Sequence, residues 1–515
     1  MSAEHYDAIV IGGGPNGLIC GAYLARAGKQ VLLIERRHET GGGLNTDEYH
    51  GWRLNLHAAY HMMSETMPAY RDLDLPGLGV RYLYPHVVAA FPFRDGSSLV
   101  FTRDLQENLR SIEAFSPDDA GAFERMWNDF QPMLEQFLVP MTYELPKPAL
   151  DQMVEFGETE VGQRLAEISE HTFIEMVDEY GFSDPRVRMA LLSFPAMWGL
   201  HLDEPLGFLF PLYLCRMLGA GIVKGGSHRV SSAIYRSFVR SGGRVLDSCE
   251  VTRIVTEGDR AVAVEIDDGR RFEADAIVST LNPEQTFVDL IDAAAIPKDL
   301  SDSVANWEWE GRSMFGLHLG VEGGVEGGVR FKAEDPRVAE AMIVFCGIET
   351  DEELIAHLEE VDAEDGIGRC DWLHFTNFSQ FDATMAPPGH ELLRFEAVVK
   401  YHPSWASEGK AFADDCLRLV GEYVELGQAA FRRHTTPVDI EQKLTTMKQG
   451  SIKHGAYSTL QLGYLRPNDL CSHSATPIPG LFIGGASLYP GGMILGGPGY
   501  VAAQVVSEEL AAKTG

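Results

Sequence analysis

Three histidines and one tyrosine are the side chains in this sequence that are placed to move protons. His57, Tyr60 and His61 lie together in the stretch LNLHAAYHMM, and His454 lies in SIKHGAYSTLQ. A neutral imidazole can accept a proton near physiological pH, so a histidine here could serve as a general base. A structural role is an equal alternative for His454. His57 and His61 would suit a metal ion if the stretch were helical, but no carboxylate or cysteine joins them, and we predict no metal site.

A glycine-rich turn near the start of the chain is the strongest binding signal. Asp7 to Ile11 form a β-branched, apolar run, which predicts a buried parallel strand. Gly12, Gly14 and Gly17 follow at once. In a dinucleotide fold these positions allow a tight turn, a close approach to a pyrophosphate, and packing of the next helix on the strand. The phosphates would then lie at the N-terminus of that helix. A flexible loop without a ligand is the alternative.

A second predicted strand supports dinucleotide binding. Val31 to Ile34 form an apolar run, and Glu35 ends it about 20 residues beyond the glycines, where an acid that binds the ribose is expected. As an anion Glu35 can accept two hydroxyl hydrogen bonds, although an exposed carboxylate at a strand end is the alternative. The predicted binding residues in this part of the chain are Gly12, Gly14, Pro15, Asn16, Gly17, Glu35, Arg36, Arg37, Gly42, Gly43 and Leu44.

Later segments return to the same domain. The stretch 225–280 predicts a helix from about Arg229 to Arg240 and then a β-meander, with turns at 257–259 and 268–269. Near the end of the chain, Leu481 to Ile483 predict a short strand, and a helix is predicted from about Gly499 to Ala512. Strand, glycine turn and helix again make an anion site at a helix start. A terminal helix that packs on the sheet without a ligand is the alternative.

The intervening regions predict a second domain. SMFGLHLGV, AMIVFCGI, DWLHFTNF and HELLRFEAVVKY are typical of strands, and Phe412 to Arg433 are predicted to be helical, so a mixed sheet covered by helices is expected. Met189 to Leu218 are predicted to form core or to line an apolar cavity, because prolines and acids make this run a poor membrane helix. We place the first domain at 1–90, 221–300 and 450–515, and the second at 91–220 and 301–449.

Several motifs carry a family resemblance. They are the E-x-R-x-x-x-G-G pattern that begins at Glu35, the phrases STLNPEQTF and FDATMAPPGH, and the paired C-terminal phrases SIKHGAYSTLQLGYLRPND and TPIPGLFIGGASLYPGG. With them the chain resembles the FAD-containing amine oxidase and phytoene desaturase superfamily. More narrowly, it resembles the carotenoid desaturase-like, phytoene dehydrogenase-related proteins, a group that includes pyridine nucleotide-disulfide oxidoreductase domain-containing protein 2.

The resemblance implies an α/β fold in which a Rossmann-like, amine oxidase-like FAD-binding domain is interleaved with a substrate domain of mixed sheet and helices. It places Val251 against the adenine end of FAD, His57, Tyr60 and His61 beside the flavin, and His454 near the ring. The C-terminal helix start would stabilise the anionic reduced flavin. The implied C-terminal FAD residues are Gly485, Ala486, Gly492, Met493 and Ile494.

The implied activity is desaturation or redox isomerisation of an apolar terpenoid, alicyclic or polyene substrate by hydride transfer to flavin. A flavin amine oxidase and a non-catalytic carrier of apolar ligands on the same fold are the alternatives. Lys453 could correspond to the flavin-contacting lysine of amine oxidases, but a lysine beside a glycine turn is expected to be solvated. No second G-x-G-x-x-G follows a strand, so we expect electrons to pass to oxygen, a quinone or another acceptor rather than to a nicotinamide cofactor.

Charge and cysteine spacing exclude several classes of binding partner. A formal net charge of -33 over 515 residues argues against nucleic acid and against an anionic membrane surface, although a weak membrane contact for substrate access stays open. The seven cysteines show no CxxC spacing, so neither a disulfide framework nor a zinc site is predicted. The first strand begins without an export signal, and a cytoplasmic location is expected. The oligomeric state stays open.

Overall fold

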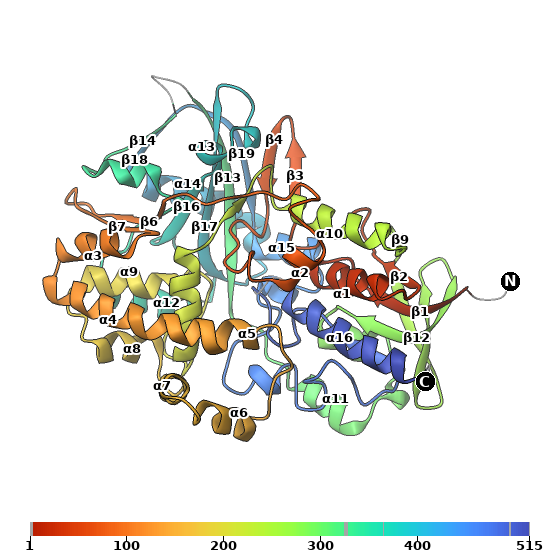
Figure 1. The fold of residues 1–515 in the computed structure, drawn as a ribbon. Coiled ribbons are helices and arrows are strands. Elements are labelled where there is room, and N and C mark those ends of the chain that lie inside the picture. Colours follow the sequence, from red (N-terminus) through yellow and green to blue (C-terminus); the bar gives the residue numbers. More distant parts are fainter. Residues whose placement is uncertain (1–3, 324–327, 364, 494–495, 514–515) are drawn as a thin grey trace.

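Two large sheets, each assembled from distant parts of the chain, organise the fold (Figure 1). The structure is a computed structural model, and it describes residues 4–323, 328–363, 365–493 and 496–513. In Figure 1 the first sheet and both chain ends lie on the right, and the second sheet with most of its helices lies on the left and at the top. The predicted α/β architecture is confirmed.

The first sheet is a parallel core extended by a meander. Its order is β10 (Val251–Glu257), β11 (Arg260–Ile266), β12 (Arg271–Ser279), β1 (Glu4–Ile11), β2 (Val31–Ile34) and β9 (Arg244–Leu246), and β20 (Leu481–Ile483) also pairs with β12. The pairs of β1 with β12 and with β2 are parallel. All four residues of β2 are buried, as its apolar run predicts for a strand covered on both faces.

The meander does more than extend the sheet. β10, β11 and β12 form the predicted antiparallel ribbon, with bends close to the predicted turn signals. The last strand of the ribbon, β12, is also a parallel neighbour of β1 and of β20. The glycine turn after β1 and the glycines after β20 therefore reach the same edge of the sheet, at the carboxyl ends of parallel strands.

Three helices pack beside this sheet. They are α1 (Pro15–Arg26), α10 (His228–Arg240) and α16 (Gly497–Ala512), and the helix predicted at the end of the chain starts two residues earlier than expected. In Figure 1 the red α1 lies along the blue α16, although the two are separated by most of the chain. The interleaving predicted for the first domain follows from this contact and from the pairing of β12 with β20.

The second sheet is mixed, as predicted. Its order is β19 (Ala429–Thr435), β13 (Arg312–Glu322), β17 (His390–Lys400), β16 (Leu373–Asn377), β15 (Ile343–Cys346), β6 (Val87–Pro92) and β7 (Ser98–Thr102). The β15–β6 pair is parallel and the other pairs are antiparallel. A division at residue 90 cuts through β6, which lies wholly in this sheet. The exact domain boundaries stay a prediction.

The helix predicted for 412–433 is wrong beyond its first two turns. Helix α14 runs from Trp405 to Val420, and the chain then forms β18 (Val424–Leu426) and β19. Gly421 follows the end of the helix, and a Cβ at Gly427 would come within 2.7 Å of the carbonyl oxygen of Glu322. The apolar spacing of the segment is compatible with a helix, but pairing with β13 decides its structure.

Helices cover the second sheet and build most of its core. Met189 to Leu218 are predominantly buried, as predicted, and Met197 and Trp198 from this run also line the cavity described below. Within the described residues, no helix is long and apolar enough to cross a membrane. The helices of this region are α3 (Leu105–Glu113), α4 (Pro117–Met133), α5 (Val139–Met141), α6 (Ala149–Phe156), α7 (Glu160–Ile168), α8 (Phe173–Tyr180), α9 (Pro185–Ala196) and α12 (Asp351–Ala363).

Shorter elements connect the two sheets or lie at their margins. The strands among them are β3 (Thr46–Tyr49), β4 (Trp52–Asn55), β5 (Tyr82–Leu83), β8 (Ile222–Val223) and β14 (Val329–Phe331). The helices are α2 (Pro68–Asp72), α11 (Lys298–Ala305), α13 (Phe378–Phe381) and α15 (Pro437–Lys443).

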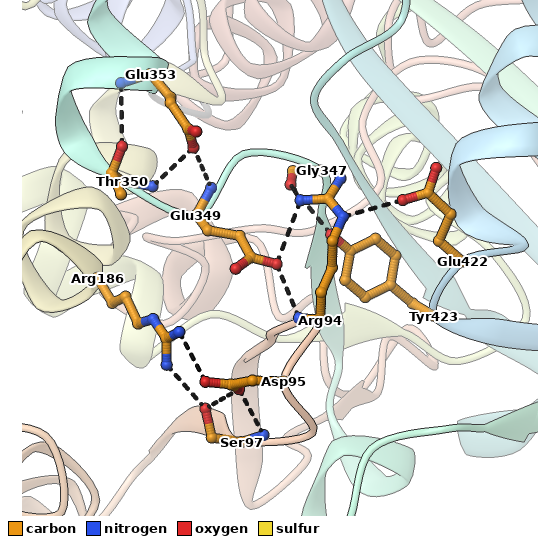
Figure 2. A network of polar contacts seen from close by, with 10 residues as sticks. All are labelled: Arg94, Asp95, Ser97, Arg186, Gly347, Glu349, Thr350, Glu353, Glu422 and Tyr423. Atoms are coloured by element: carbon orange, nitrogen blue, oxygen red, sulfur yellow. Dashed lines mark hydrogen bonds and ion pairs between the residues drawn. The ribbon is translucent and has the colours of Figure 1, made fainter.

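A network of hydrogen bonds and ion pairs connects the β6–β7 hairpin to the segments around it (Figure 2). Arg94 donates to the carbonyl oxygen of Gly347 at 2.9 Å and to the carboxylate of Glu422 at 3.1 Å. On the other side of the hairpin, Arg186 of α9 donates to Asp95 at 2.7 Å. These contacts join the hairpin to a helix and to the loop after β15, and they lie outside the cavity.

Candidate active site

The glycine turn has the geometry that its spacing predicts. Gly12 has φ +97°, which favours glycine, and a Cβ on Gly17 would lie 2.0 Å from the carbonyl oxygen of Gly12. Gly14 is the N-cap of α1, and no side chain caps the helix there. A Cβ on Gly14 would meet no atom within 4 Å. The first turn of α1 therefore presents its backbone N–H groups to an open space that an anion could fill.

Glu35 lies at the end of β2, beside this turn. Its carboxylate accepts hydrogen bonds from the backbone N–H of Gly13 at 2.7 Å and from that of Arg37 at 2.9 Å. The residue is 9% exposed and lines the cavity, so it is not the solvated strand-end carboxylate of the alternative interpretation. Two bonds leave acceptor positions of the carboxylate free for a ligand.

One cavity gathers nearly all of the predicted site residues. Its volume is about 320 Å³, within the range of small-molecule sites. It is lined by Gly12, Gly14, Pro15, Asn16, Gly17, Glu35, Arg36, Arg37, Gly42, Gly43, Leu44, His57, Tyr60, His61, Val251, His454, Ala486, Gly492 and Met493. Residues that lie far apart in the sequence thus meet at one site, although their individual roles stay predictions.

Two predicted residues stand apart from this set. Gly485 does not contribute to the cavity wall; a Cβ there would lie 2.4 Å from the carbonyl oxygen of Thr280, so close packing against the loop after β12 explains the glycine. Its role toward a cofactor stays a prediction. Ile494 lies outside the described residues.

The starts of α1 and α16 meet beside the cavity. The side-chain oxygen of Asn16 accepts a hydrogen bond from the backbone N–H of Gly499 at 3.3 Å. A Cβ on Gly499 would lie 2.1 Å from the carbonyl oxygen of Asn16, so only glycine permits this approach. Gly496, the N-cap of α16, lines the cavity. Two helix N-termini thus lie near the same space, as predicted for the glycine turns at the two ends of the chain.

Cationic side chains lie near the glycine turn. Arg37 donates to Glu39, and its buried Nη1 has no hydrogen-bond partner among the described residues. Lys443 donates to Asn45 at 3.0 Å and to Asp47 at 2.9 Å, and it also lines the cavity. An unpaired, buried guanidinium nitrogen in the same cavity wall as the start of α1 suits a diphosphate.

Four histidines line the cavity: His61 and His374 are buried, and His57 and His454 are half-buried. Burial, together with the charges of Arg394, Lys443 and Arg37, lowers the pKa of His57 to about 3. Burial lowers the pKa of His61 to about 4, and burial with the charge of Arg466 has the same effect on His454.

The imidazoles of His57, His61 and His454 are therefore neutral at neutral pH, and they resist protonation. Nδ1 of His61 lies 2.8 Å from the hydroxyl of Tyr82, while Nε2 of His57 and Nδ1 of His454 find no hydrogen-bond partner in the described part of the chain. The stretch that carries His57 and His61 is not helical, so their spacing does not place them on one helix face. No three metal-ligating side chains gather anywhere in the described residues.

The expectation that Lys453 is solvated is wrong. Its side chain is 2% exposed; Nζ donates to the carbonyl oxygen of Trp198 at 3.0 Å and lies 3.3 Å from the Glu310 carboxylate. A buried ion pair, rather than the neighbouring glycine turn, decides its position. Lys453 is not part of the cavity wall.

Sequence reasoning missed a charged cluster on the second sheet. Tyr60 donates to the Glu396 carboxylate at 2.8 Å, and Arg394 donates to the same carboxylate at 2.7 Å. Nε2 of His374 lies 3.3 Å from Glu396. All four line the cavity. A signal was present in HELLRFEAVVKY, because Arg394 and Glu396 are two residues apart on an apolar strand and must therefore share one face.

The Glu396 carboxylate stays ionised in this setting. Burial alone would raise its pKa, but the charge of Arg394 and the contacts with His374 and Tyr60 together lower it below the usual range. For Tyr60, burial and the neighbouring Glu396 raise the pKa well above its usual value. Tyr60 is therefore a neutral donor to an anionic acceptor.

The polar groups of the cavity fit FAD. Glu35 has free acceptor positions for a ribose, the start of α1 has open donors for a diphosphate, and Arg37, in the same cavity wall, has an unpaired nitrogen. Val251 and Cys249 line the cavity near Glu35, where the resemblance predicts the adenine. Tyr60, with Arg394 and Glu396 of the second sheet, lines the same cavity.

Comparisons with known proteins agree with this geometry. The family model described as "Flavin containing amine oxidoreductase" matches residues 16–496. The chain is 40% identical to one of the subunits of limonene dehydrogenase from Castellaniella defragrans, with 98% of this chain and 95% of that protein covered. It is 25% identical to pyridine nucleotide-disulfide oxidoreductase domain-containing protein 2 of Mus musculus, with coverage of 98% and 94%. The predicted resemblance to this group is confirmed.

A solved structure shows the same fold. An oxidoreductase from Methanosarcina mazei superposes with a TM-score of 0.60 at 17% identity, with 97% of this chain and 99% of that chain covered.

Proposed function

The chain belongs to the family of flavin-containing amine oxidoreductases, and on this premise we propose that it is an FAD-dependent dehydrogenase of an apolar terpenoid substrate. The observation that carries the proposal is the single cavity that joins the dinucleotide-binding turn to an apolar wall. That wall includes Leu56, Ala59, Met62, Met63, Met197, Met314, Ile440 and Ile452. Its apolar character suits a hydrocarbon skeleton, as does the 40% identity with a limonene dehydrogenase polypeptide.

When bound, FAD supplies the acceptor for a hydride that leaves a substrate carbon. The protein's own contribution is to position the substrate, to exclude water, and to receive a proton. Apolar side chains exclude water from the wall on the second sheet. Within the proposal, His57, Tyr60 and His61 form the wall of the active site, and His454 is the proton acceptor. Because the pKa of His454 is about 4, it would act on a strongly acidic proton, such as that of a carbon next to a developing cation.

Anaerobic spectroscopy tests the proposal. The purified protein, reconstituted with FAD where needed, is mixed without oxygen with limonene and, separately, with terpenoid alcohols, and flavin absorbance and product mass are followed together. We expect the flavin to bleach and the product to be two hydrogens lighter, or isomerised if the electrons return. A colourless protein that does not take up FAD would contradict the proposal, and so would a flavin that no terpenoid reduces.

The same experiment separates the alternatives. Bleaching by putrescine or benzylamine, but not by terpenoids, would identify an amine oxidase. Binding of terpenoids without any flavin reduction would identify a carrier. Neither result is expected, because the cavity wall has an extended apolar surface and the phosphate-binding turn is fully formed.

Location and partners complete the proposal. We place the enzyme in the cytoplasm, without nucleic-acid partners, and with at most a weak membrane contact through which an apolar substrate enters. The name of the relative at 40% identity makes that relative one part of a multi-chain enzyme, and a partner chain is therefore a proposal for this protein as well. Size-exclusion chromatography with light scattering measures the oligomeric state.

A further inference from the structure

A small polar group interrupts the apolar wall of the cavity on the second sheet. Tyr60, Trp198, His374 and Glu396 all line this wall, among methionines and aliphatic side chains. The ring of Tyr60 is central: its centroid lies 6.0 Å from that of Trp198 and 6.1 Å from that of His374. A purely hydrocarbon ligand would have no use for polar atoms at this position.

The hydrogen bonds within this group are incomplete. The Tyr60 hydroxyl donates to Glu396 at 2.8 Å, and the side chain of Thr376 also acts on this hydroxyl as a hydrogen-bond partner, which leaves one acceptor position of the Tyr60 oxygen. The indole N–H of Trp198 is buried and has no hydrogen-bond partner among the described residues. One free acceptor and one free donor thus lie on neighbouring rings.

Other contacts hold the carboxylate that orients Tyr60 and the backbone of Trp198. Arg394 donates to the carbonyl oxygen of Leu56 at 2.9 Å and to Glu396 at 2.7 Å, so the carboxylate that orients Tyr60 is itself held. The carbonyl oxygen of Trp198 accepts a hydrogen bond from the buried Lys453 at 3.0 Å. Such support is what a preorganised binding group needs, because no side-chain freedom is lost when a ligand arrives.

An alcohol is the functional group that satisfies both free positions. Its O–H can donate to the oxygen of Tyr60, and its oxygen can accept from the indole N–H of Trp198. A hydrocarbon would leave both groups unpaired, and a complex that leaves a buried polar group unpaired is weaker by roughly 5- to 150-fold than one that pairs it. A ketone could accept from Trp198 but could not donate to Tyr60.

We propose that Tyr60 and Trp198 form a hydroxyl-binding subsite, and that the substrate is a terpenoid that carries an alcohol group. This inference rests on the proposed function and narrows its substrate class. The subsite binds and orients the alcohol, and Glu396, through its hydrogen bond with Tyr60, is a positioning residue.

Equilibrium binding tests the subsite without turnover. The FAD-loaded protein is reduced with dithionite and titrated calorimetrically with menthol and with p-menthane, which share a saturated skeleton and differ by one hydroxyl group. We expect the parent to bind menthol at least about tenfold more tightly than p-menthane. In Tyr60→Phe and in Trp198→Phe the preference should fall below about threefold, while the affinity for p-menthane changes little.

A matched control isolates the effect of position. The indole N–H of Trp372 is also buried without a hydrogen-bond partner among the described residues, but Trp372 does not line the cavity. Trp372→Phe should therefore retain the full preference for menthol. FAD content and circular dichroism establish that each variant is folded, and if Tyr60→Phe is not, Trp198→Phe decides alone.

The outcomes separate this inference from the proposed function. A parent preference below about tenfold overturns the subsite, and so does a preference that survives in every folded variant. If the preference is present and falls in the variants, but no terpenoid bleaches the flavin, the subsite stands and the dehydrogenase proposal fails. If terpenoids bleach the flavin but the parent shows no preference for menthol, the dehydrogenase proposal stands and the subsite fails.

Discussion

Replacement of Glu35 gives a quantitative test of the cofactor-binding end of the cavity. Glu35 is 9% exposed, and its carboxylate already accepts hydrogen bonds from the backbone N–H groups of Gly13 and Arg37, so its position at the turn is fixed. Each hydrogen bond from a ribose hydroxyl to an anion contributes roughly 1.5–3 kcal/mol. Loss of two such bonds in Glu35→Ala corresponds to about 3–6 kcal/mol, or a rise in the dissociation constant for FAD of roughly 10²- to 10⁴-fold.

The assay is a fluorescence titration of the apoprotein with FAD. Glu35→Gln should give an intermediate loss, because the amide keeps one acceptor but places its NH₂ group toward a backbone donor. Asp7→Asn is the matched control: Asp7 accepts the backbone N–H of Gln30 at 2.6 Å, but it does not line the cavity. If Glu35→Ala binds FAD within about threefold of the parent, the assignment of Glu35 to the ribose is refuted.

Three further predictions follow from the same geometry. Gly17→Ala should lower the melting temperature of the apoprotein, because its Cβ would lie 2.0 Å from a backbone oxygen. Gly14→Ala should leave that temperature unchanged and weaken FAD binding. Equal melting temperatures and equal FAD affinities of the two variants would contradict the turn geometry. The pKa values of about 3 for His57 and about 4 for His61 and His454 lie below the ordinary 6.5, so unfolding takes up protons as the pH falls from 6.5 toward 4. The free energy of unfolding should therefore drop over this interval, by up to about 1.4 kcal/mol per pH unit for each histidine, and urea titrations at several pH values that show no slope would disprove this. NADH and NADPH should not reduce the bound flavin rapidly or in equal amounts, and anaerobic mixing with either nucleotide measures this directly.

The cofactor-binding end of the cavity could be predicted from sequence because most of its residues lie in one contiguous stretch of the chain. A tight turn, a close backbone approach and a helix start require glycine at Gly12, Gly14 and Gly17, and the acid that faces the ribose must end the next strand. The structure brings these residues into one cavity wall with Glu35. The prediction that the C-terminal segment returns to this site succeeded for the same reason, since a short strand, glycines and a helix recur there.

The substrate-binding end could not be predicted in the same way, because its residues meet only in the folded protein. Tyr60 lies in a loop and Glu396 on β17, 336 positions later, and their hydrogen bond depends on how the second sheet packs against the first domain. The wrong helix beyond Val420 has a related cause, since pairing with β13 outweighs local spacing. Burial of Lys453 likewise depends on Glu310, which is distant in sequence.

A crystal structure of the FAD-loaded protein would show whether one cavity between the two sheets holds both the cofactor and an apolar substrate. We expect the ribose at Glu35, the adenine beside Val251, the diphosphate at the start of α1, and the flavin ring toward His57 and Tyr60. Density for a cofactor elsewhere, or for FAD in the opposite direction along the cavity, would contradict this expectation.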